Sequence, residues 1–160
     1  MNTPDRKKES VWDYPRPPRI DPSTETVEVW FGGLQVAAST ATVRVLETSH
    51  PPTYYFPPTD VREDLLQPVA GSSFCEWKGP ASYFDLFVES HTARRAVWCY
   101  PRPTQPFTAI AGWYAFYPAL MERCVVDGYE IQAQEGDFYG GWITPNLVGP
   151  FKGAPGTRGW

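Results

Sequence analysis

The sequence has few of the residues that mark a metal site, a disulfide framework or a nucleic-acid surface. Its three cysteines, Cys75, Cys99 and Cys124, are an odd number and form no Cys-x-x-Cys pair. We therefore expect reduced thiols and no zinc, since structural zinc sites use closely spaced ligand pairs. Lysine and arginine number 14 against 18 acidic residues, a net charge of −4. This balance argues against a nucleic-acid partner, which would require a basic face.

Targeting and membrane segments are also lacking. The first ten residues are charged and contain no apolar stretch of the kind that a secretory signal needs. Residues 103–121 carry no charge, but prolines and polar residues interrupt them, and the pattern favours a buried strand over a membrane span. We expect a cytoplasmic protein with no membrane partner.

Aromatic and turn-forming residues are abundant instead. The 160 residues include 7 Trp, 9 Tyr, 9 Phe, 18 Pro and 13 Gly. The aromatic content excludes a disordered chain, and the Pro and Gly content favours short strands joined by tight turns. A chain of this length can bury a core without metal or disulfide support. The expected fold is mainly β: a single compact β domain of short strands and hairpins, with one or two short helices.

Along the chain, residues 1–25 are expected to form a Pro-rich N-terminal arm and residues 26–160 a single β-rich domain. Two hairpins are predicted, at residues 26–38 around Gly32-Gly33 and at residues 125–133 around Asp127-Gly128. Further strands are expected at residues 41–47, 54–56, 74–78, 82–89, 94–100 and 109–116. Short helices are expected at residues 60–66 and 119–124, the first from an N-cap at Asp60 with Glu63 three residues on.

Two internal echoes suggest related halves. Residues 12–17 (WDYPRP) recur as residues 98–103 (WCYPRP), and residues 33–37 (GLQVA) resemble residues 128–132 (GYEIQ). The two offsets differ, so a duplication would require insertions. Either two pseudo-related halves or convergence on a turn sequence explains the echoes.

The candidate site residues are titratable side chains that lie beside aromatic ones. His50 follows Glu47 and sits in a loop stiffened by Pro51-Pro52, and the ordinary histidine pKa near 6.5 suits acid–base chemistry. Glu76 and Lys78 alternate with Trp77, so on a strand both would face one side. They would then form either a charged surface beneath a ligand or an exposed strand face.

The aromatic strand 54–56 would place Tyr54 and Phe56 on one face and Tyr55 on the other. In the Gly-rich tail, Tyr139 and Trp142 carry polar groups that can bind a polar ring. We therefore assign candidate catalytic roles to Glu47, His50, Glu76, Lys78 and Asp137, and candidate ligand-binding roles to Tyr54, Tyr55, Tyr83, Trp98, Tyr139, Trp142 and Lys152.

A subset of these residues, drawn from segments that end in Gly or Pro, is expected to line one shared cleft, because binding groups gather on loops at the edge of a rigid sheet. The alternative places their charges on separate solvated faces. The expected cleft residues are Glu47, His50, Tyr55, Glu76, Lys78, Tyr139, Trp142 and Lys152.

Several segments in this order resemble the bacterial and fungal family called domain of unknown function 427. The segments are residues 44–52, 54–57 (YYFP), 60–61, 75–79 (CEWKG) with Ala81 and Tyr83, 98–101, 136–144 and 149–153, and the resemblance covers about residues 26–160. It implies a compact, mostly β fold and little about activity. The family also carries a nucleotidyltransferase-like name. Here Gly71-Ser72 is not followed by the paired aspartates that hold two metal ions, so we do not expect that chemistry.

Three functions remain open. The favoured one is a β domain that binds a small polar molecule in a polar-aromatic cleft. The second is a cofactor-free enzyme that uses Glu, His and Lys for acid–base chemistry. The third is a protein-interaction module that docks through its Pro-rich arm. We expect no cofactor and no metal, and a homodimer remains one option for the assembly.

Overall fold

The computed structural model describes residues 7–136 and 139–160, and β-strands dominate these ranges. Both predicted hairpins are confirmed. Strands β3 (Val27–Phe31) and β4 (Leu34–Ser39) are joined through Gly32-Gly33, and strands β11 (Arg123–Val126) and β12 (Tyr129–Glu130) through Asp127-Gly128. All four turn residues have positive φ, the conformation that a tight hairpin turn requires.

The two hairpins form one sheet in the order β12-β11-β3-β4, with β11 antiparallel to β3 at its centre. The segments that begin at Gly33 and Gly128 therefore occupy corresponding places on either side of the β3–β11 pair. The other sequence echo has no such counterpart. Residues 11–13 form a 3₁₀ turn (Val11–Asp13), whereas Trp98 and Cys99 end strand β9.

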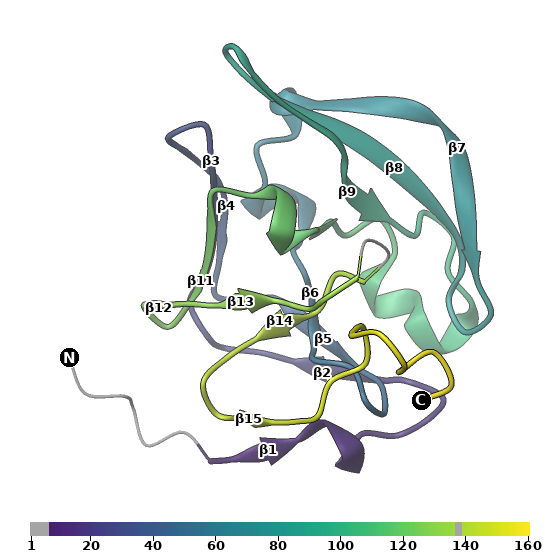
Figure 1. Ribbon diagram of the computed structural model, residues 1–160. Coiled ribbons are helices and arrows are strands. Elements are labelled where there is room, and N and C mark those ends of the chain that lie inside the picture. Colours follow the sequence, from purple (N-terminus) through teal and green to yellow (C-terminus); the bar gives the residue numbers. More distant parts are fainter. Residues whose placement is uncertain (1–6, 137–138) are drawn as a thin grey trace.

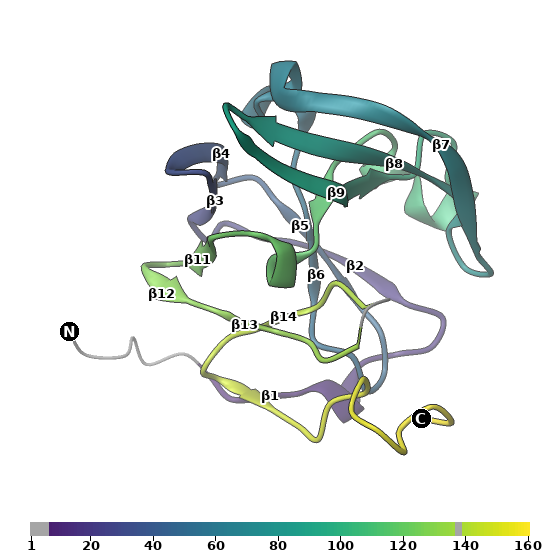
Figure 2. The same ribbon diagram turned by 45° about the horizontal axis from the view of Figure 1, so that its top comes forward.

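A second four-stranded sheet lies across the top of the molecule in Figures 1 and 2. Its order is β10-β9-β8-β7, formed by β7 (Leu66–Cys75), β8 (Gly79–Val88), β9 (His91–Cys99) and β10 (Ala115–Phe116). β7 is an edge strand, which is where a strand can hold a proline such as Pro68. The long β7–β8 hairpin projects its tip toward the functional site described below.

Three smaller pairings complete the fold. β2 (Arg19–Pro22), β5 (Val43–Leu46) and β6 (Thr53–Tyr55) form a sheet in the order β2-β5-β6. β1 (Glu9–Ser10) pairs with β15 (Leu147–Val148), and β13 (Gln132–Ala133) pairs with β14 (Trp142–Ile143).

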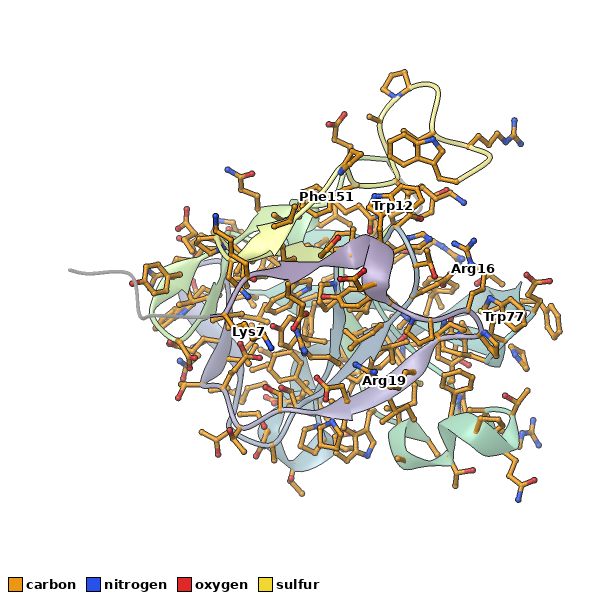
Figure 3. The ribbon with its side chains drawn as sticks, turned by 90° about the horizontal axis from the view of Figure 1, so that it is seen from below. Lys7, Trp12, Arg16, Arg19, Trp77 and Phe151 are labelled. Carbon is orange, nitrogen blue, oxygen red and sulfur yellow. The ribbon has the colours of Figure 1, made fainter. Side chains whose placement is uncertain are left out.

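Residues 9–22, which were expected to belong to an arm, are thus integrated into the fold. Val11 and Tyr14 are buried against Leu46. Trp12 faces the C-terminal loop in Figure 3, where its indole N–H donates to the carbonyl of Pro150 at 2.8 Å and its ring packs edgewise on Trp160. The first and last segments of the described chain therefore pack together.

The predicted helices are wrong in detail. Residues 60–66 form parts of two 3₁₀ turns, Pro58–Asp60 and Glu63–Leu65, after which Leu66 begins β7. Residues 119–124 fall in the 3₁₀ turn Pro118–Leu120 and the start of β11. Segments this short cannot offset the cost of nucleating an α-helix. No helix among the described residues is long and apolar enough to cross a bilayer.

The strand expected at residues 109–116, within the uncharged stretch 103–121, is also mostly wrong. That stretch contains the 3₁₀ segment Gln105–Ile110, the short strand β10 and the turn Pro118–Leu120. Pro106 and Pro118 each lie at the first or second position of a 3₁₀ segment. A fixed φ suits proline to such starts, whereas its missing N–H removes a donor from a sheet.

The alternation of residues 54–56, at the end of strand β6 and just beyond it, divides the core into two clusters. Tyr54 and Phe56 pack into the first cluster, with Phe116 and Trp142, whereas Tyr55 packs into the second, with Trp98. The first cluster fills the space between the two four-stranded sheets, and the second lies beneath the β7–β9 sheet and contributes the aromatic walls of the site.

Phe56 tests the first cluster. Phe56→Ala removes a fully buried ring that contacts Phe116 and Trp142, and we expect it to lower the free energy of unfolding by about 3–5 kcal/mol in urea denaturation. Phe74→Ala is the matched control, because Phe74 is 73% exposed, and its effect should stay within about 0.5 kcal/mol. Equal losses of unfolding free energy in the two variants would contradict the placement of Phe56 in the core.

Candidate functional site

A cavity of about 310 Å³ opens beside the tip of the β7–β8 hairpin. Its walls come from β5 and the following loop, from the hairpin tip, from β9 and from the C-terminal segment between Gln134 and Lys152. Parts of the chain that are far apart in sequence therefore meet around one space. A neighbouring cavity of about 620 Å³ shares several of its wall residues, among them Tyr83, Tyr117 and Gln134.

Most of the candidate residues line this cavity. Of the eight residues expected in one cleft, seven do so and Trp142 does not. Trp142 is fully buried in the first core cluster with Tyr54, the other candidate outside the cavity, because both rings fill the space between the sheets. Asp137 lies outside the described residues. The candidates that line the cavity are Glu47, His50, Tyr55, Glu76, Lys78, Tyr83, Trp98, Tyr139 and Lys152.

Glu76 and Lys78 lie in a turn and not on a strand, contrary to expectation. β7 ends at Cys75 and β8 begins at Gly79, so strand alternation does not place the two side chains on one face. Thr104 fixes this turn: its hydroxyl donates to the carbonyl of Trp77 at 2.5 Å and its N–H donates to the carbonyl of Lys78 at 3.1 Å. The turn leaves Glu76 exposed and buries Lys78.

Lys78 is only 9% exposed. Its ammonium lies 5.5 Å from the ring centre of Tyr100 and 5.9 Å from that of Phe107, within cation–π range. Across residues 7–136 and 139–160, no carboxylate forms an ion pair with it and no acceptor receives a hydrogen bond from it. The side chain is thus held in the protein by aromatic contacts, and its ammonium lies in the cavity wall.

Gln134 is the principal residue that sequence reasoning missed. It is 4% exposed, and its side-chain oxygen accepts a hydrogen bond from the N–H of Gly141 at 3.1 Å. Its side-chain nitrogen donates to the carbonyl of Lys152 at 2.7 Å and to Nδ1 of His50 at 3.2 Å. Glutamine is usually a surface residue, and no motif surrounds this one. The sequence therefore carried no signal for its role.

The contacts of Gln134 determine which ring nitrogen of neutral His50 carries the proton. Turning the amide over would set oxygen against the Lys152 carbonyl and NH₂ against the Gly141 N–H, so the backbone determines its orientation. Nδ1 of His50 must then accept, which leaves the proton of the neutral ring on Nε2. That nitrogen lies 3.6 Å from a carboxylate oxygen of Glu47, beyond ordinary hydrogen-bond range.

The surroundings of His50 also favour its neutral form. Burial, together with the positive charges of Lys152, Arg16 and Lys78, lowers its pKa to about 4. Glu47, the acidic neighbour, is shared with Arg16, whose Nε lies 3.5 Å from it. At neutral pH His50 is therefore an uncharged ring that presents an N–H donor.

Tyrosine hydroxyls supply further polar groups. The hydroxyl of Tyr55 accepts a hydrogen bond from the indole N–H of Trp98 at 3.3 Å, and that of Tyr83 lies 2.6 Å from the hydroxyl of Ser73. Burial raises the pKa of Tyr55 and of Tyr100 well above the ordinary value. Both phenols keep their protons at neutral pH and can donate. Tyr100, Tyr117 and Ser73 were not among the sequence-based candidates.

Comparison with known proteins identifies the family to which the chain belongs. Residues 19–127 match the family described as a domain of unknown function, DUF427, with the short name NTP_transf_9. The chain belongs to the DUF427 family. No curated protein matches it. In this DUF427 domain Gln134, Tyr139 and Lys152 lie beyond the matched region, yet they complete the cavity.

The resemblance to DUF427 seen in the sequence is thus confirmed, as is the mainly β fold that it implied. All three cysteines of the DUF427 domain are free. In the described part of the chain, no three His, Cys, Asp or Glu side chains are grouped so that they could hold a metal ion.

The protonation state of His50 can be measured directly. We expect ¹⁵N NMR of the DUF427 domain to show the proton on Nε2 and a pKa near 4. Gln134→Glu replaces the donor beside Nδ1 with a carboxylate, which favours protonation there and should raise the pKa of His50. A proton on Nδ1 in the wild type, or an unchanged pKa in the variant, would contradict the assigned network.

The same shift predicts acid sensitivity. Because the pKa of His50 is lowered to about 4 in the folded state, the unfolded chain binds the proton first. Stability should therefore fall as pH decreases from about 6.5 to about 4, by an amount on the order of a few kcal/mol. His50→Asn keeps an acceptor for Gln134 but cannot titrate, so its thermal stability should depend less on pH. His91→Asn, at an exposed position, should behave like the wild type; identical pH profiles for all three proteins would contradict the shift.

Proposed function

We propose that this domain binds a small polar molecule in the cavity beside the β7–β8 tip. The observation that carries the proposal is Lys78, a largely buried residue whose ammonium lies in the cavity wall without an acidic partner among the described residues. Ligand sites typically contain a few convergent polar groups that fix the orientation of the ligand. An unpaired ammonium held by aromatic rings is such a group.

Shape and lining support the same function. A volume of about 310 Å³ lies at the lower end of the range for small-molecule sites, about 300–1,000 Å³. Trp98, Tyr55 and Tyr100 provide ring surfaces along one side of it. Such side chains can contact an apolar body while their N–H and O–H groups bind its polar atoms.

The acid–base alternative has less support. A general base needs a nitrogen that is free to accept a proton from the substrate. In His50, Nε2 already carries the proton and Nδ1 accepts from Gln134. The interaction alternative relied on a free arm, but the Pro-rich segment from Glu9 to Pro22 pairs with β15 and β5. Binding a small molecule is the function that this geometry favours.

Cys75 offers a test. It is the half-buried thiol in the cavity wall, whereas Cys99 and Cys124 are buried. A set of small polar aromatic fragments should include members that shift the indole N–H resonance of Trp98 but not that of Trp12. Alkylating Cys75 with N-ethylmaleimide should fill the cavity and abolish these shifts.

Cys75→Ser is the matched control for this experiment. Treated with the same reagent, it has no thiol in the cavity and should keep the response of Trp98 to the fragments. If fragment binding survives alkylation of the wild type, or if no fragment in the set shifts Trp98, the proposed function is wrong.

A further inference from the structure

We propose that the ligand carries an anionic oxygen group, a carboxylate or a phosphate, that binds against Lys78, with Lys152 as the second cation. This inference rests on the proposed function and specifies the class of ligand. It follows from the unpaired ammonium of Lys78 in the cavity wall, from the donors available there, and from the positions of the acidic neighbours, which do not pair with Lys78.

The acidic residues of the wall do not neutralise its lysines. Glu47 interacts with Arg16 and faces His50. Glu76 is exposed at the rim and forms no ion pair within the described part of the chain. Lys152 lies 5.9 Å from the ring centre of Tyr139, and its ammonium donates a long hydrogen bond, 3.4 Å, to a backbone oxygen of Trp160. The ammonium of Lys78 therefore remains without a carboxylate partner among the described residues.

The same cations also act on His50. Burial is the largest cause of its lowered pKa, and the positive charges of Lys152, Arg16 and Lys78 lower it further. The chain as a whole carries a charge of −4, and Glu47 and Glu76 also line the cavity, so the attraction for an anion is local and comes from the ammonium groups themselves.

Several polar groups at the cavity are available as donors. Lys78 offers N–H groups that no acceptor occupies within the described ranges, and His50 presents Nε2–H, with its nearest carboxylate oxygen at 3.6 Å. Tyr100 has a protonated hydroxyl. Carboxylates and phosphates are rich in acceptors, and their hydrogen bonds to charged donors are stronger than neutral ones. An anionic oxygen group therefore complements this wall, whereas a cation or a donor-rich ligand does not.

Three probes of similar size separate the possibilities. Benzoate and phenyl phosphate carry the two anions, and benzamide is the neutral counterpart of benzoate. Titrations at low salt, followed by the indole N–H of Trp98, should give both anions dissociation constants near 1 mM, a value reasonable for so few atoms. Benzamide should bind at least about tenfold more weakly, because it lacks the charge-assisted contact.

Lysine variants test whether Lys78 contacts the anionic group of the probe. Lys78→Met should weaken benzoate binding at least about tenfold, whereas Lys78→Arg, which keeps the charge, should retain most of it. Lys8→Met removes the same charge from an exposed position that does not line the cavity and should bind as the wild type does. The ratio of the two anion affinities then distinguishes a carboxylate ligand from a phosphate ligand.

Three results would overturn the inference. If benzamide binds as tightly as benzoate, or if Lys78→Met leaves benzoate binding unchanged, the ligand is not selected by its negative charge, and the cavity remains a binding site of another class. If none of the three probes shifts the Trp98 resonance while other fragments of the set do, the anion inference fails and the proposed function stands.

Discussion

The side-chain amide of Gln134 is the interaction on which the site depends. It is buried, and both of its N–H groups and its oxygen are bound. Through them it joins the His50 loop, the start of β14 and the backbone at Lys152. Gly141 permits this approach, because a Cβ there would lie 2.5 Å from the amide oxygen. The amide thus closes the cavity and also sets the donor that His50 presents.

The sequence predicted those elements whose structure is set by local turn residues. It failed for segments whose structure is set by contacts between residues far apart in the chain. The hairpins at Gly32-Gly33 and Asp127-Gly128 follow from backbone preference alone. The turn at residues 76–78 depends on Thr104, which sequence reasoning cannot place beside it. The strand expected at residues 109–116 does not form as predicted, because the prolines on either side of it start 3₁₀ turns.

Most of the cavity wall could be recognised in the sequence, because its residues lie in segments that combine charged and aromatic side chains near Gly or Pro. Trp142 lies in such a segment too, but it belongs to the core.

The cavity combines two features that favour binding over acid–base catalysis. Lys78 provides a charge that the described protein does not neutralise, and His50 is a neutral donor whose second nitrogen is occupied by Gln134. Buried polar groups are normally satisfied within a fold. Both of these groups lie on the cavity wall, which points to a ligand that completes their bonding. Gln134 and Lys152 lie beyond the region matched to the DUF427 family, so the C-terminal segment supplies cavity wall that the matched region does not.

We propose that the unpaired ammonium of Lys78 makes this cavity a binding place for an anion. Anomalous diffraction from crystals soaked in bromide tests this directly, whatever the natural ligand is. We expect a bromide peak inside the cavity in contact with Nζ of Lys78, and no peak at that place in Lys78→Met. Bromide bound only at the outer surface of the wild type, or a cavity peak that persists in Lys78→Met, would show that Lys78 does not bind an anion.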